Sequence, residues 1–246
     1  MNTPDDTILK VRDIHTRFET FNGTVYAVNG VDFDLCKGET LAVVGESGSG
    51  KSVTMLSLLG LLPAVGSRVS GQAVLRITDP PADLIAVSKQ QLNKVRGKHI
   101  GIVFQDALRS LNPVLTVGEQ INESLVTHMG YTQASARKRA IELLEHVGIS
   151  QPDKRYSSYP HQFSGGMRQR AMIAIAIACS PEILIADEPT TALDVTIQTQ
   201  IIELTRRLQR ELGMTVIWIT HDLGVVAGIA DRSEEHTSEL QSLLII

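Results

Sequence analysis

Cysteine is nearly absent from this sequence. The only two cysteines, Cys36 and Cys179, lie far apart in the chain and form no C-x-x-C pair. This usage supports neither a disulfide scaffold nor a cysteine-based zinc site. We therefore expect two free thiols in a reducing cytosol.

Long apolar runs and an excess of positive charge are also missing. Apolar runs such as residues 171–179 are too short to span a bilayer, which takes about 20 residues. Residues 1–6 contain no basic segment that leads into an apolar one, so no secretory signal is predicted. The net charge of −4 gives no bulk electrostatic case for binding nucleic acid or an anionic membrane surface. If the protein serves a membrane, we expect it to dock on other subunits.

What remains is the composition of an ordinary globular protein, with 43% apolar and 20% charged residues. Short apolar runs rich in β-branched residues predict strands, and apolar residues at helical spacing predict helices. The two kinds of element alternate, which implies a largely parallel sheet with helices on both faces. Predicted strands cover 8–11, 25–35, 40–44, 72–78, 99–104, 183–186 and 215–220. Predicted helices cover 51–62, ended by Pro63, then 165–179 and 194–212, and a helical sub-domain is expected around 116–147.

The last residues differ in character from the rest. Residues 232–242 resemble the in-frame translation of a sequencing-library adapter, and an apolar Leu-Leu-Ile-Ile follows them. We therefore predict that residues 232–246 are a non-native tail and that the chain is a fragment. A genuine acidic tail is the alternative.

A glycine-rich stretch fits the pattern G-x-x-x-x-G-K-[ST], which is the phosphate-binding loop. Such glycines let the backbone N–H groups surround an anion at a helix N-terminus. An accidental Gly/Ser turn is the alternative, but the stretch lies between a buried strand and a helix, as a phosphate loop should. Lys51 is expected to reach the β- and γ-phosphates, and the Ser52 hydroxyl to bind Mg²⁺. The predicted nucleotide-binding residues here are Gly45, Glu46, Ser47, Gly48, Ser49, Gly50, Lys51, Ser52 and Val53.

Two adjacent carboxylates follow the buried strand predicted at residues 183–186. They belong at the carboxyl edge of the parallel sheet, where the phosphate loop is also expected. Asp187 is predicted to hold Mg²⁺, through a water. Glu188 is predicted to accept a proton from, or to orient, the water that attacks the γ-phosphorus. Taken alone, the pair could equally be a strand followed by an acidic helix cap.

A third motif opens the helix predicted at residues 165–179. Ser164 is a plausible N-cap, and Gly165 and Gly166 leave backbone N–H groups accessible to an anion. The three motifs together resemble the ATP-binding cassette (ABC) family. The resemblance implies that residues 164–167 are the signature motif, which contacts the γ-phosphate bound to the opposite subunit of a dimer.

The family's remaining motifs match in order over roughly residues 8–231, which would form the ABC ATPase domain. Gln105 matches the Q-loop, which senses the γ-phosphate or Mg²⁺. Residues 192–194, ending in Asp194, match the D-loop, and His221 matches the switch histidine. The resemblance implies an α/β fold of the P-loop NTPase class with a mostly parallel sheet. It also implies an N-terminal antiparallel β sub-domain and an α-helical sub-domain inserted at about residues 106–165.

Three longer stretches narrow the resemblance to the ATPase subunits of the dipeptide, oligopeptide and nickel importers: 104–106 with 110–120, 159–170, and 186–194. Met167 is similar to the first of the two ATPase subunits in such systems. Residues 107–109 depart from the group's usual pattern in a loop that neighbours the membrane-subunit contact. The implied partners are a second, different ATPase subunit, two transmembrane permease subunits and an extracellular solute-binding protein. The implied location is peripheral, on the cytoplasmic face of the membrane.

Two questions stay open at this point. Phe18 is the best positional match for the aromatic residue that stacks on adenine, with Phe21 and Tyr26 as rivals. The function could also be that of a non-transport ABC ATPase of the DNA-repair or translation-factor type. The repair type carries a long coiled coil between its phosphate loop and signature, and the translation type carries two cassettes. This chain shows a short connection and one cassette.

Overall fold

The structure is a computed structural model, and it describes residues 6–191, 193–229, 234–235 and 244–245. It divides into two compact units. The first consists of residues 1–93 and 215–246, and the second of residues 94–214. The short helix α2 (Lys89–Val95) runs across the boundary in sequence. Each unit is described by itself.

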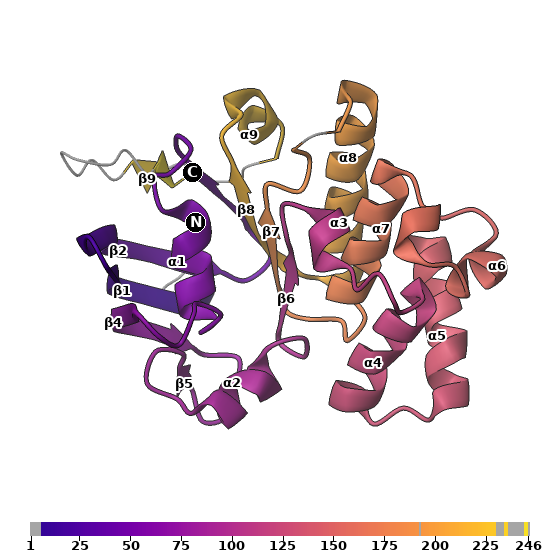
Figure 1. Ribbon diagram of the computed structural model, residues 1–246, viewed down its shortest axis with the longest axis horizontal. Helices are drawn as coiled ribbons and strands as arrows, with labels where there is room; N and C mark the ends of the chain where they lie inside the picture. Colours follow the sequence, from indigo (N-terminus) through magenta and orange to yellow (C-terminus); the bar gives the residue numbers. More distant parts are fainter. Residues whose placement is uncertain (1–5, 192, 230–233, 236–243, 246) are drawn as a thin grey trace. The chain divides into compact units, whose positions relative to one another are not determined.

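An antiparallel sheet occupies the N-terminal part of the first unit. Its strand order is β2 (Gly23–Cys36), β1 (Thr7–Thr20), β4 (Ser67–Leu75) and β5 (Ala82–Asp83) (Figure 1). β1 and β2 form a hairpin that closes at the pair Thr20 and Gly23. The expected antiparallel β sub-domain is confirmed.

Two of these strands differ from their predicted limits. β1 extends to Thr20 rather than Val11, through shifts in register that bend the strand. β4 starts at Ser67, opposite Phe18, and ends at Leu75, opposite Leu9. The predicted strand at 72–78 is therefore wrong at both ends, because the length of β1 available for pairing decides where β4 begins and stops.

The first unit also contains a parallel pair of strands. β3 (Thr40–Val44) is buried at every position and pairs in parallel with β8 (Thr215–Thr220), with Val44 opposite Thr220. Helix α9 (Leu223–Ile229) covers this pair, and its Val226 packs with Ala42 and Val44. The carboxyl ends of the two strands therefore lie side by side, so the segments that follow them start at the same edge.

Helix α1 (Lys51–Leu58) follows β3 and packs on β1 and β2. The prediction that this helix continues to Leu62 and ends at Pro63 is wrong. Gly60 adopts a φ of 57°, and the Leu61 N–H donates to the Leu56 carbonyl at 2.9 Å. This is a Schellman end, in which a left-handed glycine satisfies the last carbonyls of the helix.

A second parallel pair lies in the second unit. β6 (Ile100–Val103) pairs with β7 (Ile183–Asp187), with Val103 opposite Ala186. Every residue of β7 is buried, which explains its unbroken apolar sequence up to Asp187. The two parallel pairings confirm the expected α/β class.

Helices make up most of the second unit. Between β6 and β7 the chain contains no strand. The helices of this segment are α3 (Ala107–Ser110), α4 (Val117–Met129), α5 (Gln133–His146), α6 (Pro152–Tyr156), a 3₁₀ turn (Pro160–Gln162) and α7 (Gly165–Ala176), and α8 (Val195–Leu212) follows β7. The helical period found near residue 140 belongs to α5.

Local sequence signals explain how the first of these long helices begins and packs. Thr116 and Glu119 form a reciprocal capping box at the start of α4. The packing of α4 on α6 depends on Gly118 and Tyr156. A Cβ at Gly118 would lie 2.3 Å from the Tyr156 ring, so the absence of a side chain lets α4 approach α6. The sub-domain limits of 106–165 stay a prediction, since the compact unit runs from residue 94 to 214.

The predicted non-native tail lies mostly outside the described residues. Of residues 232–246, the structure describes only β9 (Glu234–Glu235) and β10 (Leu244–Ile245). β10 pairs antiparallel with β3, Leu244 opposite Val44. Within the part of the chain that the structure describes, no helix has the length and apolar character needed to cross a membrane.

Candidate nucleotide site

The predicted site residues fall into two groups, one in each unit. The first group is centred on the loop between β3 and α1, which holds residues 45–50. Lys51, Ser52 and Val53 open α1. Lys51 is only 4% exposed, and its Nζ donates to the carbonyls of Gly45 at 2.7 Å and Glu46 at 2.8 Å. The loop thus curls around the lysine ammonium group, which is the expected shape of a phosphate loop.

Two glycines give this loop its path. Gly48 and Gly50 adopt φ values of 86° and 91°, in the left-handed region that favours glycine. A Cβ at Gly50 would lie 2.4 Å from the Ala27 carbonyl oxygen, so no larger residue fits there. A Cβ at Gly48 would meet nothing within 4 Å, which leaves open space beside the loop.

The polar groups of the loop fit an anionic ligand. Helix α1 starts after Gly50, which has no side chain that could cap the N–H groups of the first turn. The Ser49 hydroxyl is buried and has no hydrogen-bond partner among the described residues. Burying such a group without a partner is costly, and a phosphate oxygen is an acceptor it could use. Together with the Lys51 ammonium group, these donors match the charge and geometry of nucleotide phosphates.

His221 lies at the same edge as the phosphate loop. It follows β8 directly, as Gly45 follows β3, and the last residues of these parallel strands are paired. The imidazole is exposed. The structure therefore brings the predicted switch histidine to the strand end beside the loop.

Strand geometry separates the three candidate adenine aromatics. Thr16 faces α1, since its hydroxyl lies 2.7 Å from that of Ser57. Phe18, two residues further along β1, shares that face. Tyr26 pairs with Arg17 and so points to the other face, and Phe21 is fully exposed in the hairpin turn. This arrangement favours Phe18, which stays a prediction.

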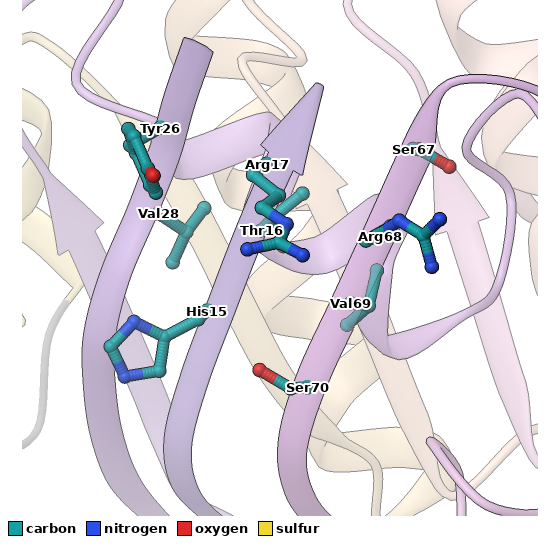
Figure 2. A pocket seen from close by; sticks show the side chains of 9 residues that line it. All are labelled: His15, Thr16, Arg17, Tyr26, Val28, Ser67, Arg68, Val69 and Ser70. Carbon is teal, nitrogen blue, oxygen red and sulfur yellow. The ribbon is translucent and has the colours of Figure 1, made fainter. Parts of the chain in front are cut away.

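The other face of the antiparallel sheet carries a shallow hollow of about 610 Å³. Figure 2 shows it across β2, β1 and β4, with Tyr26, Arg17 and Arg68 among its lining side chains. Arg17 and Arg68 are directly opposite each other across the strands. Tyr26, a rival candidate for stacking on adenine, lines this hollow, whereas Phe18 and the phosphate loop do not.

The second group of site residues follows the parallel strands of the second unit. Gln105 comes just after β6 and Glu188 just after β7. The Gln105 amide Nε2 donates to Glu188 Oε2 at 2.9 Å, although 83 residues separate the two in sequence. The parallel pairing of β6 and β7 thus brings the predicted sensor and the predicted general base into direct contact.

Asp187 is the last residue of β7, and it is 7% exposed. Its place at the carboxyl end of a fully buried strand agrees with the sequence prediction. The adjacent Glu188 has a φ of 44°, a left-handed conformation that is uncommon for a non-glycine residue. The strand therefore ends at Asp187, and the backbone turns at Glu188.

The predicted signature motif lies at the start of α7. Ser164 is the N-cap, and its hydroxyl accepts a hydrogen bond from the Met167 N–H at 3.3 Å. A Cβ at Gly166 would lie 2.9 Å from Ile197 Cγ2, whereas one at Gly165 would lie 3.6 Å from Leu193. Gly166 therefore also serves the packing of α7 against the start of α8, a role that the sequence did not reveal.

The predicted D-loop leads into α8. Asp194 is the N-cap of this helix and accepts from the Ile197 N–H at 3.0 Å. Ala192, the first residue of the predicted D-loop, lies outside the described residues. Asp194 is exposed, so it can cap α8 and also take part in the predicted nucleotide site.

Thr191 is a contact of Glu188 that sequence reasoning missed. Its Oγ1 donates to Glu188 Oε2 at 2.9 Å, and the same oxygen accepts from Gln105. The spacing of three residues was visible in the sequence. The spacing alone did not predict the contact, because a turn with this geometry, including the left-handed Glu188, is not encoded by a recognised sequence pattern.

Comparison with known proteins agrees with this arrangement. Residues 28–191 match the sequence model of the family described as ABC transporter. The chain belongs to this family. The match spans the phosphate loop, Gln105, the signature motif and Asp187–Glu188.

This ABC family member has close relatives among the peptide transport proteins. It is 53% identical over 225 residues to the dipeptide transport ATP-binding protein DppD of Bacillus subtilis, and 53% identical over 226 residues to the oligopeptide transport ATP-binding protein OppD of the same organism. Each alignment covers 92% of this chain, but only 66% of DppD and 62% of OppD. The chain thus spans somewhat less than two thirds of the length of these relatives.

Solved ABC structures share the fold. The cassette MJ0796, in a dimeric post-hydrolysis state bound to ADP and Pi, superimposes with a TM-score of 0.77 at 29% identity, covering 92% of this chain and 97% of its own. The cbiO1 protein of Clostridium perfringens, part of an ABC transporter complex, gives a TM-score of 0.73 at 31% identity, covering 92% of this chain and 83% of its own.

Proposed function

We propose that this chain is the ATP-binding and ATP-hydrolysing part of an ABC importer that takes up peptides or a related small solute. The observation that carries the ATPase proposal is the contact between Gln105 and Glu188 in a family member whose phosphate loop curls around Lys51. The identity of 53% to two peptide transport proteins supports the importer.

In the proposed reaction, ATP binds by its phosphates to the loop of residues 45–53. The N–H groups at the start of α1 and the Lys51 ammonium group hold the β- and γ-phosphates. Phe18 stacks on the adenine from the face of the antiparallel sheet that carries α1. These interactions position ATP without breaking a bond.

Hydrolysis is the task of the second group. Glu188 accepts a proton from a water molecule, whose oxygen forms a bond to the γ-phosphorus while the bond to the leaving ADP oxygen breaks. Gln105 orients this carboxylate, and His221 steadies the γ-phosphate. Mg²⁺ fits the oxygen donors Ser52, Gln105 and Asp187, and when bound it would neutralise phosphate charge.

Dimerisation and partners complete the proposal. Ser164, Gly165 and Gly166, at the start of α7, would contact the γ-phosphate held by a second ATPase subunit, with Asp194 at the same interface. We propose a heterodimer that docks on two permease subunits at the cytoplasmic face of the membrane and receives solute from an extracellular binding protein. The exposed Leu108 of α3, in the loop that departs from the family pattern, is a candidate contact for a permease.

The ATPase proposal is tested with the variant Glu188→Gln. We expect it to bind ATP as the wild type does, to lose at least about a hundredfold in turnover, and to accumulate the closed dimer. Binding is measured with a fluorescent ATP analogue, turnover by phosphate release and dimerisation by light scattering. Undiminished hydrolysis would contradict the role of Glu188.

The importer proposal needs a separate test. We expect the genes beside this one to encode a second ATPase, two multi-span permeases and a secreted binding protein, and the chain to co-purify with the permeases when they are expressed together. A neighbourhood without membrane-protein genes would favour a non-transport ATPase of the repair or translation type.

A further inference from the structure

We propose that Thr191 is a positioning residue that holds the Glu188 carboxylate in the orientation needed for hydrolysis. This inference rests on the proposed function, because it concerns the group that we assign as general base. Glu188 has two donors on one oxygen. Oε2 accepts from Thr191 Oγ1 and from Gln105 Nε2, each at 2.9 Å.

The two donors differ in how they are attached to Glu188. Gln105 is exposed and comes from the segment after β6, 83 residues away in sequence. Thr191 belongs to the same turn as Glu188, and its own N–H donates to the Glu188 carbonyl at 3.1 Å. A movement of the Gln105 loop therefore breaks one contact and leaves the other. Thr191 is the donor that stays with Glu188 when Gln105 turns to a ligand.

The backbone at Glu188 adopts an uncommon conformation, and its side chain has a local hydrogen-bond partner. Its φ of 44° is a left-handed conformation, which a residue with a Cβ adopts only when its surroundings enforce it. A half-buried glutamate also has several rotatable bonds, so its carboxylate needs a fixed partner to keep one direction. A threonine hydroxyl is a suitable partner, because the β-branched side chain has few χ1 states.

This geometry predicts where the effect of Thr191 will be seen. The hydroxyl donates to the carboxylate that we propose takes the proton from water, and the loop that we propose binds ATP is a separate part of the chain. Loss of the hydroxyl should therefore lower kcat and leave the KM for ATP nearly unchanged. A general packing defect would instead lower the amount of folded protein or change both constants.

The experiment compares three variants of the chain. Thr191→Val keeps the shape and removes the donor, and we expect kcat to fall about tenfold with KM within about twofold of the wild type, as for a lost hydrogen bond to a charged group. Thr191→Ser keeps the donor and should retain at least half of kcat. Thr24→Val is the matched control, since Thr24 donates to the exposed carboxylate of Glu19 at 2.8 Å on the β1–β2 hairpin.

A double variant tests whether Thr191 acts through Glu188. In the Glu188→Gln background, which retains residual hydrolysis, adding Thr191→Val should change the rate less than twofold. A further tenfold loss there, or a Thr191→Val enzyme with normal kcat, would overturn the inference while leaving the ATPase proposal in place. If Thr191→Val unfolds, Thr191→Ala carries the same comparison. A wild type without ATP hydrolysis would overturn the proposed function itself.

Discussion

The two groups of site residues are built in opposite ways. The phosphate loop is one continuous stretch between β3 and α1, and its shape depends on backbone groups and on the φ values of Gly48 and Gly50. The surroundings of Glu188 are assembled from side chains of separate segments, with Gln105 contributed from 83 residues away. A continuous backbone motif can be identified from sequence, whereas a constellation of side chains becomes visible only in the fold.

The same contrast predicts different kinds of damage. An unsuitable substitution in the phosphate loop should distort the backbone, because the loop conformation depends on left-handed glycines. A substitution in α7 or α8 should disturb one packing contact, to which the neighbouring side chains can adjust. The following predictions test this difference, starting with the largest expected effect.

The first prediction contrasts the two left-handed glycines of the loop. Gly50→Ala places a Cβ 2.4 Å from the Ala27 carbonyl oxygen and strains φ as well, so we expect at least about a hundredfold loss of ATP affinity and roughly 3 kcal/mol of stability. Gly48→Ala, which meets no atom within 4 Å, should cost only the φ strain of about 1–2 kcal/mol. Nucleotide titration and urea denaturation measure both. Equal losses of stability and ATP affinity in the two variants would show that backbone strain, and not the contact with Ala27, causes the damage.

The second prediction concerns the same kind of crowding in the signature helix. Gly166→Ala would bring a Cβ to 2.9 Å from Ile197 Cγ2, and we expect a cost of about 1–3 kcal/mol in the free energy of unfolding. Because the neighbour here is a side chain, the double variant Gly166→Ala with Ile197→Ala should lose less than the two single changes added together. Gly165→Ala is the control, with an ordinary contact of 3.6 Å to Leu193. Strict additivity would contradict the proposed contact.

The third prediction tests a side chain that joins segments of the second unit. Arg170 donates to the Val147 carbonyl at 2.6 Å and to Gln200 at 3.0 Å, which links α7 to the end of α5 and to α8. Arg170→Met should cost about 1–2 kcal/mol, since it leaves the carbonyl without this donor. Arg206→Met, at an exposed arginine of α8, should change stability by less than about 0.5 kcal/mol. Denaturation curves that do not separate the two variants would refute this role.

The smallest effect at neutral pH is expected at the buried thiol of the same unit. Cys179 Sγ lies 3.5 Å from the Ser124 carbonyl oxygen of α4, and burial raises the pKa of this thiol from 9.0 to about 11. The folded state thus holds the proton more tightly, so the stabilisation is complete below pH 9 and is lost as pH rises towards 11. The fall in unfolding free energy between pH 9 and 11 should be shallower in Cys179→Ala. Identical slopes would mean that the thiol ionises equally in both states.

Features set within a few residues were predicted well from the sequence. The strand, the glycine loop and the start of the helix at Lys51 agree with the structure, as does the N-cap at Ser164. Each depends on local backbone hydrogen bonds or on φ preferences, which neighbouring residues determine. The class of the fold followed from the alternation of strands and helices for the same reason.

Features that depend on distant partners were predicted poorly or not at all. The start of β4 at Ser67 follows from its pairing with β1, opposite Phe18. The end of α1 at Leu58 is an exception: its cause, the left-handed Gly60, is local, but the sequence prediction ended the helix at Pro63.

The sequence by itself determined that this chain is an α/β protein with a phosphate loop before α1 and two carboxylates after a buried strand. These features depend on contiguous residues, whose backbone preferences act over a few positions. Only the tertiary structure decided that Gln105 and Thr191 meet on one oxygen of Glu188, and that Gly166 makes room for Ile197. Such contacts depend on the pairing of β6 with β7 and on the packing of α7 against α8. These bring together residues that are distant in sequence, so local sequence patterns do not predict their contact.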